Sequence, residues 1–227
     1  MSDPDRETRQ AIHGDQYARQ FANDRQTARV ARLVEHIQLP QGANILDVGC
    51  GIGLLAGILA TRYGSYTGVD FSSAMLREAR AQADARGLRH CGFLCADAIE
   101  VMLENVGAYD AVFMLDISEH VPDREWADIV KAAWLALKPA GRIYLHTPNL
   151  DFMLERMKQH GWIRQFPEHV AVRDARENMR FFHEAGCTSV VCNVLPHYNI
   201  LRWLHPLIRL PVIGKYLAAR LWIVAVK

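Results

Sequence analysis

Two spacings of apolar residues alternate along the chain. Short, almost continuously apolar runs recur, and the longer segments between them place apolar residues three or four positions apart. A short continuous run predicts a strand covered on both faces, whereas the longer spacing predicts an amphipathic helix. Strands are predicted at 44–48, 65–69, 91–95, 109–115, 142–147, 188–194 and 221–226.

Helices are predicted between these strands. The clearest covers 123–137, where Trp126 and Val130 share one apolar face. Ser72 or Ser73 is suited to cap another helix, because a short hydroxyl side chain accepts from the free N–H groups at a helix start. The predicted helices are 18–37, 54–63, 72–86, 123–137 and 174–184.

This alternation of strands and helices predicts an α/β fold with a doubly wound parallel sheet. We expect one domain over 1–227, with residues 1–40 forming an N-terminal helical cap. The segments 149–173 and 196–220 interrupt the alternation. Because ligands bind beyond the carboxyl ends of the strands in such sheets, we interpret both segments as substrate-side insertions.

Composition excludes several classes of protein. The formal net charge is +1, which gives no overall field for nucleic acid. The polar start of the chain has no signal-peptide pattern, and no apolar run reaches membrane-spanning length. We therefore expect a cytoplasmic protein. The five cysteines are odd in number and form no C-x-x-C pair, which disfavours both disulfides and a zinc site.

The end of the chain is basic and apolar. No acidic residue follows Glu184, and basic and aliphatic residues alternate over 201–220. Such a segment is typical of a membrane-surface element or of a port for an apolar substrate, so peripheral membrane contact is one expectation. The alternative is packing on the sheet with the basic groups solvated, because Pro206 and Pro211 interrupt a simple amphipathic helix.

The sharpest motif is Asp47-Val48-Gly49-Cys50-Gly51-Ile52-Gly53, at a predicted strand-to-helix turn. A dinucleotide site favours G-x-G-x-x-G, but here the spacing is G-x-G-x-G after an acidic residue. The motif resembles motif I of the class I S-adenosylmethionine-dependent methyltransferases. The resemblance implies that Gly49, Gly51 and Gly53 pack against the amino-acid end of the cofactor, and that Asp47 lies near its ammonium. It also implies the Rossmann-like sheet of that family, with seven strands, of which the last is antiparallel.

Two further strand ends match this family. Asp70 matches its ribose-binding carboxylate, which is followed by Phe71 against the adenine, and Asp97-Ala98 matches its adenine-amino acceptor. Met75 and Leu115 are further candidates for the pocket wall. An aspartate at a strand end can instead cap the next helix, but three matches in order favour the cofactor.

The stretch 116–123 resembles the acidic-x-x-Glu-His-Val-Pro-Asp segment of the 3-demethylubiquinone-type O-methyltransferases. His120 is the predicted general base or substrate orienter. In part of that family, positions matching Asp116, Glu119 and His120 hold a divalent cation. Two carboxylates suit Mg²⁺, whereas histidine suits zinc or iron better. In the alternative, the carboxylates satisfy backbone N–H groups at the next helix start.

Two more histidines are candidates for catalysis. His146 ends a predicted strand, and His169 lies in the first insertion. At either position a structural role is the alternative. Nothing in the chain resembles the Pro-Pro-aromatic motif of nucleobase-amine methyltransferases, so a nucleic-acid partner is not expected.

The leading hypothesis is O-methylation of a hydroxyl on a small or lipid-linked acceptor. A glycan or another lipid-carried metabolite is a close alternative. A nicotinamide-dependent reductase is disfavoured by the glycine spacing and by the lack of a Tyr-x-x-x-Lys pair. A membrane-docking module with a vestigial pocket is disfavoured by the intact Asp70 and Asp97.

Overall fold

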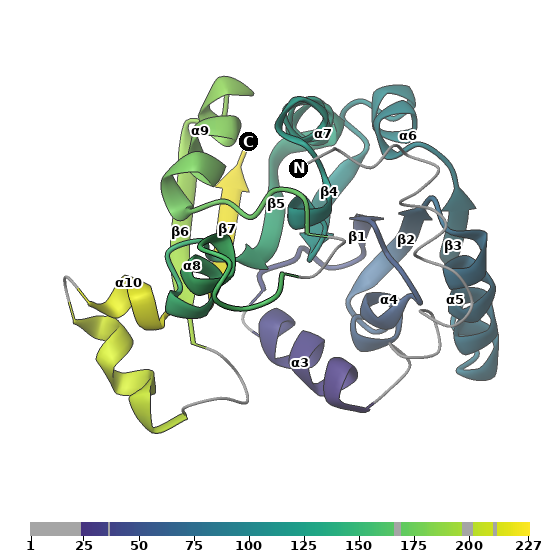
Figure 1. Ribbon diagram of the computed structural model, residues 1–227. Coiled ribbons are helices and arrows are strands. Elements are labelled where there is room, and N and C mark those ends of the chain that lie inside the picture. The colour runs from purple at the N-terminus through teal and green to yellow at the C-terminus, as the bar shows by residue number, and fades with distance from the viewer. Residues whose placement is uncertain (1–23, 36, 166–168, 197–201, 211–212) are drawn as a thin grey trace. The chain divides into compact units, whose positions relative to one another are not determined.

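The computed structural model describes residues 24–35, 37–165, 169–196, 202–210 and 213–227 (Figure 1). Its strands form one seven-stranded sheet in the order β3-β2-β1-β4-β5-β7-β6. β1 pairs in parallel with β2, and β2 with β3, whereas β6 and β7 are antiparallel. The predicted fold class is therefore confirmed, including the antiparallel last strand. The strands are β1 (Ala43–Val48), β2 (Tyr63–Asp70), β3 (Cys91–Cys95), β4 (Tyr109–Leu115), β5 (Leu137–Pro148), β6 (Ser189–Leu195) and β7 (Arg220–Val226).

The helices follow the predicted alternation, with two short additions. The unpredicted elements are α6 and η1. The insertions predicted at 149–173 and 196–220 also contain short helices. The helical elements are α3 (Asp24–Val34), α4 (Leu54–Ile58), α5 (Ser73–Ala85), α6 (Ala98–Glu104), η1 (Ser118–His120), α7 (Asp123–Ala136), α8 (Met153–Gln159), α9 (Ala175–Glu184), η2 (Arg202–Arg209) and α10 (Gly214–Leu217).

Several predicted boundaries were wrong. The helix predicted at 54–63 stops at Ile58, and Tyr63 already belongs to β2. The helix predicted at 123–137 ends at Ala136, and β5 begins there rather than at 142. The second boundary is set by pairing with a distant segment, because the N–H groups of Gly107 and Ala108 donate to the carbonyls of Leu135 and Ala136 at 3.0 Å.

The predicted helix 18–37 is represented by α3, since residues 1–23 lie outside the described part of the chain. The single-domain organisation with a cap over 1–40 stays a prediction. Among the described residues, no helix combines the length and the apolar character needed to cross a bilayer.

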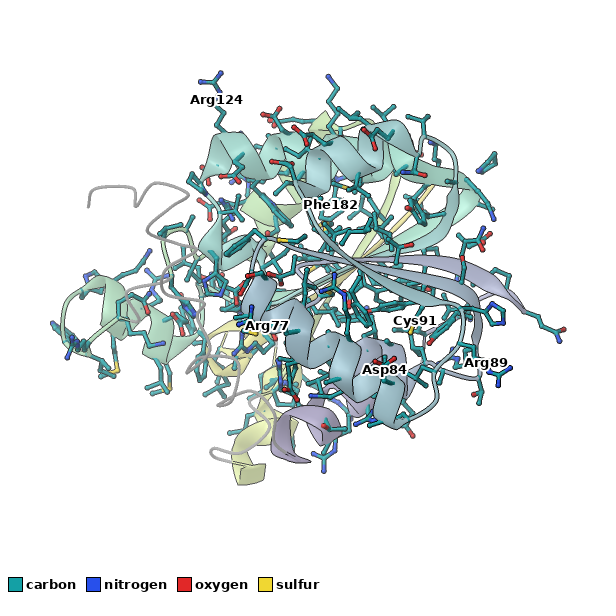
Figure 2. All side chains as sticks on the ribbon, turned by 90° about the vertical axis from the view of Figure 1, so that its right-hand side faces the viewer. Arg77, Asp84, Arg89, Cys91, Arg124 and Phe182 are labelled. Carbon is teal, nitrogen blue, oxygen red and sulfur yellow. The ribbon has the colours of Figure 1, made fainter. Side chains whose placement is uncertain are left out.

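Two compact units make up the chain, and the first consists of residues 1–113 and 135–142. Its parallel strands β1, β2 and β3 bury Ile45, Leu46 and Tyr66. α5 packs on β2 and β3, with Leu76 fully buried (Figure 1). Figure 2 looks onto this helix, whose exposed side carries Arg77 and Asp84. Ser72 caps α5, because its side chain accepts from the N–H of Met75, as one of the two predicted caps.

The second unit consists of residues 114–134 and 143–227. α9 packs on β6 and β7, and Phe182 of that helix is fully buried (Figure 2). α7 buries Trp126 and Val130, the face predicted from its spacing. Asp174 starts α9 with a capping box, in which its side chain and that of Glu177 exchange hydrogen bonds with each other's backbone.

Candidate functional site

The glycine turn after β1 is held against the end of β2 by backbone hydrogen bonds. The N–H groups of Gly49 and Cys50 both donate to the carbonyl of Val69, at 2.8 and 3.1 Å. Gly51 has a φ of +52°, and no atom lies within 4 Å of the place where its Cβ would stand. A turn of this kind lets a ligand approach the backbone closely, and a side chain at Gly51 would occupy that space.

Gly53 is needed for a different reason. Its φ is +72°, and a Cβ there would stand 2.9 Å from Cε1 of Phe93 on β3. Packing therefore requires this glycine, in addition to any contact with a ligand. The motif thus combines an open position at Gly51, where a Cβ would meet no atom, with a closed position at Gly53, where a Cβ would collide with Phe93.

Asp70 is fixed by the same turn. Its Oδ2 accepts from the N–H of Gly51 at 2.9 Å, and its Oδ1 accepts from the N–H of Ser72 at 2.8 Å. Burial raises the pKa of this carboxyl, and the backbone donors oppose that rise. Each carboxylate oxygen has a second lone pair, so Asp70 can still accept from the two hydroxyls of a ribose. The arrangement fits the predicted cofactor.

Asp47 is buried beneath the turn, where the phenol of Tyr66 donates to Oδ2 of its carboxylate. The pKa of Asp47 is raised to about 7, chiefly by burial. The hydrogen bond from Tyr66 opposes this rise, and the negative charge of Asp70 adds to it. A carboxylate that is hard to ionise gains most from a nearby cation. The ammonium of S-adenosylmethionine, which the resemblance implies lies near Asp47, is such a cation.

The other predicted cofactor residues of the first unit have structural contacts as well. Asp97 caps α6, since its side chain accepts from the N–H of Ile99 at 2.8 Å, and Ala98 is the first residue of that helix. Met75 is buried against Ile52. Phe71 follows Asp70 and is half-buried. The adenine-side roles of Asp97, Ala98 and Phe71 stay predictions, as does that of Leu115, which belongs to the second unit.

A cluster of charged and polar residues follows β4 in the second unit. Nδ1 of the fully buried His146 lies 2.7 Å from Oδ1 of Asp116. Arg220, the first residue of β7, donates to the same oxygen at 3.4 Å and lies 3.9 Å from Oε1 of Glu119. Asp116 is thus engaged by a histidine and a guanidinium. His146, a predicted catalytic candidate, is therefore a partner of Asp116, a predicted metal ligand.

Glu119, His120 and His169 form a second group. One ligand atom from each of the three lies within 4.8 Å of the other two, a spacing that could hold a metal ion. The rings of His120 and His169 meet edge to face at 5.1 Å. The backbone of the insertion supports this contact, because the N–H groups of Val170 and Ala171 donate to the carbonyl of Glu119. Two of the three predicted metal residues are in this group, and Asp116 is not.

Three residues of this site were not identified from the sequence. Arg173 is buried and donates to the carbonyls of Ser118 and Val121, both at 2.7 Å, on either side of the Glu119–His120 pair. Thr147 donates to Oε2 of Glu119 at 3.4 Å. Arg220 is the third. Two of them had a signal in the sequence: Thr147 lies near the end of a predicted strand, and Arg173 lies in a predicted insertion. Only these positions could have indicated that the two residues belong to a site.

The chain is similar in sequence to known methyltransferases. A family model described as "Methyltransferase domain" matches residues 45–141. A ubiquinone biosynthesis O-methyltransferase from Acinetobacter baylyi is 36% identical over 121 residues, which are 53% of this chain and 50% of that protein. The protein of the same name from Idiomarina loihiensis is 43% identical over 122 residues, 53% of this chain and 49% of that protein. This chain therefore spans about half the length of the curated relatives that it matches.

Solved structures show the same fold. A SAM dependent methyltransferase from Archaeoglobus fulgidus has a TM-score of 0.70 and is 16% identical, covering 93% of this chain and 98% of its own. The fold expected from the sequence is thus confirmed: the chain has the fold of these methyltransferases, and its segment 45–141 matches a methyltransferase domain. S-adenosylmethionine is the cofactor that this match implies.

Proposed function

We propose that this chain transfers the methyl group of S-adenosylmethionine to a hydroxyl on a small or lipid-linked acceptor. The observation that carries the proposal is the pairing of the open position at Gly51 with the carboxylate of Asp70, which the turn itself holds in place. The matches to O-methyltransferases over half of the chain support the choice of a hydroxyl acceptor. A glycan hydroxyl on a lipid carrier would use the same chemistry.

Each cofactor residue has a defined task in this proposal. Asp70 accepts from the ribose hydroxyls, and Asp47 compensates the ammonium of the amino-acid end. The cofactor supplies a methyl group that its sulfonium already activates. The acceptor oxygen forms a bond to that methyl carbon as the carbon–sulfur bond breaks, and the electron pair of the broken bond returns to sulfur. The protein's part is to align the reacting groups and to manage the proton of the acceptor.

His120 is the residue we assign to the acceptor. A phenol has a pKa of about 10, so neutral pH leaves it protonated unless a base or a metal ion assists. His120 is the last residue of η1, the short helix that follows β4, and Glu119 beside it is 2% exposed. We propose that its imidazole orients the acceptor hydroxyl or takes its proton.

A lipid-linked acceptor also agrees with the surface near the end of the chain. Leu207, Leu210 and Ile213 expose 39%, 41% and 53% of their surfaces. Arg209 lies among them, and the sequence has no acidic residue after Glu184. Apolar side chains interleaved with positive charge complement an anionic lipid surface. We therefore propose peripheral contact with such a membrane through 201–220.

Calorimetric titration with S-adenosylmethionine, with its demethylated product and with NADPH tests the proposal. We expect micromolar binding of the first two and none of NADPH. Acceptor screening would then begin with phenols and lipid-linked hydroxyls. Binding of NADPH alone would favour a reductase, and binding of none would leave the docking module as the better hypothesis.

A further inference from the structure

We propose that Glu119, His120 and His169 bind a divalent transition-metal ion of the zinc type, and that Asp116 is not a ligand of it. The binding itself stands on the geometry of the second unit. Its use rests on the proposed function: the bound ion would ionise the acceptor hydroxyl, and His120 would act through that ion instead of taking the proton itself. The proposal replaces two features expected from the sequence, namely Asp116 as a ligand and Mg²⁺ as the ion.

The spacing of the donor atoms is close to that of a bound ion. Ligand atoms from the three side chains lie within 4.8 Å of one another. Zinc bonds to imidazole nitrogen and carboxylate oxygen are about 2.0–2.2 Å long, so ligand atoms around one ion lie about 3–4 Å apart. Small side-chain rotations of the half-buried His120 and His169 would close that difference.

The chemistry of the donors selects the kind of ion. Two imidazoles and one carboxylate form the ligand set of catalytic zinc sites, and they also suit iron and other first-row metals. Mg²⁺ instead favours oxygen ligands and retains much of its water. Three protein ligands leave a coordination position open for a hydroxyl, whose pKa a bound metal ion lowers.

The surrounding backbone holds the three ligands together. The carbonyl of Glu119 accepts from the N–H groups of Val170 at 2.8 Å and Ala171 at 3.1 Å, which fixes the segment next to His169. Thr147 donates to the carboxylate of Glu119. Such contacts to the ligands raise metal affinity because they orient the side chains in advance.

Asp116 has other partners. Its Oδ1 lies 2.7 Å from Nδ1 of His146 and accepts from Arg220 at 3.4 Å. A metal ion near that oxygen would have to compete with the guanidinium for it. Arg220 is more distant from Glu119, at 3.9 Å, so the guanidinium competes less strongly for that carboxylate.

Metal titration of variants separates the two ligand sets. Zn²⁺ would be followed by equilibrium dialysis with elemental analysis, and Co²⁺ by its visible absorption bands. We expect one ion per wild-type chain, Asp116→Asn to bind within a few-fold of wild type, and His169→Ala to bind at least about 100-fold more weakly. His169→Cys supplies a thiolate ligand and should recover Zn²⁺ binding. Millimolar Mg²⁺ should not displace Co²⁺.

The outcomes are distinct. Loss of binding in Asp116→Asn with binding kept in His169→Ala would overturn the proposal, as would the absence of binding in the wild type. Far-ultraviolet circular dichroism, measured on every variant, reports whether the chain is folded, and S-adenosylmethionine affinity is measured separately. Metal binding without cofactor binding would overturn the proposed function but not the metal site, and cofactor binding without metal binding would do the reverse.

Discussion

The two compact units assemble their functional residues in contrasting ways. In the first, the key contacts are donated by backbone N–H groups of nearby segments, as when the N–H of Gly51 donates to the carboxylate of Asp70, 19 positions away. In the second, they are side-chain contacts between distant segments, as when Arg220 donates to Asp116 across 104 positions. A site made by local backbone geometry tolerates changes around it. A site made by converging side chains depends on each of its members.

The largest effect should follow from removing His120 in the second unit. His120→Ala should lower turnover of an accepted hydroxyl substrate by about 10²- to 10⁴-fold, because the hydroxyl loses the group that orients or deprotonates it. Cofactor affinity should not change, as calorimetry would show. His160→Ala is the matched control, since His160 is an exposed histidine of the same unit. Full turnover in His120→Ala would exclude it from the chemistry.

Removing the carboxylate of Asp70 should weaken cofactor binding by the first unit and leave metal binding by the second unit unchanged. Asp70→Ala should weaken S-adenosylmethionine binding by about 100-fold, because one or two charge-assisted hydrogen bonds to the ribose are lost. Calorimetry measures this, and zinc binding by the second unit should persist. Asp84→Ala, at an exposed aspartate of α5 seen in Figure 2, is the control. Equal cofactor affinity in Asp70→Ala and wild type would contradict the proposed pocket.

The titration of Asp47 should make cofactor binding depend on pH. Its pKa is raised to about 7, and only the ionised form attracts the ammonium of the cofactor. Affinity should therefore rise about tenfold between pH 6 and pH 8, with proton release on binding below pH 7. Calorimetry in buffers of different ionisation enthalpy measures both. Asp47→Asn should abolish the pH dependence, and a dependence that persists there would assign it to another group.

The same raised pKa has a consequence for stability. Folding disfavours ionisation of Asp47, so its contribution to the free energy of unfolding is present below its unfolded-state pKa of about 4. That contribution is lost as the pH rises toward the folded-state value of about 7.

The smallest effect concerns the surface near the end of the chain. Ile213→Glu should weaken binding to phosphatidylglycerol vesicles about threefold, because half of this side chain is exposed and available for burial. Co-sedimentation measures the change, with phosphatidylcholine vesicles as the neutral comparison. Val106→Glu changes an exposed apolar residue of the first unit and should have no effect. Equal binding of wild type and Ile213→Glu would remove this surface from the proposal.

The same contrast explains how much could be predicted from the sequence. The strand ends at Asp47 and Asp70 were identified because apolar runs mark strands and because glycine spacing reports backbone geometry. β3 and β4 begin and end where the pattern predicted. The cap at Ser72 follows from the same local rules.

The residues that were missed belong to long-range contacts. Arg220 looked like one more base in a basic tail, and its role depends on β7 pairing with β6 in the sheet. Arg173 was missed, and His169 was expected only as a catalytic candidate. Both lie in an insertion without periodicity, so no spacing relates them to Glu119. Helix boundaries near Leu137 also depended on pairing with a distant segment.

Asp116 combines two requirements that a mutational library would separate. Its φ of 56° lies in the left-handed region, where glycine, asparagine and aspartate are the least strained residues. A codon library at this position, selected only for folded protein, should retain chiefly those three. A second selection for activity should then enrich aspartate over asparagine and glycine, since the carboxylate is what His146 and Arg220 contact. The counts of aspartate, asparagine and glycine codons at position 116 would be compared between the two selections. The comparison separates the requirement for a left-handed backbone from the requirement for a carboxylate.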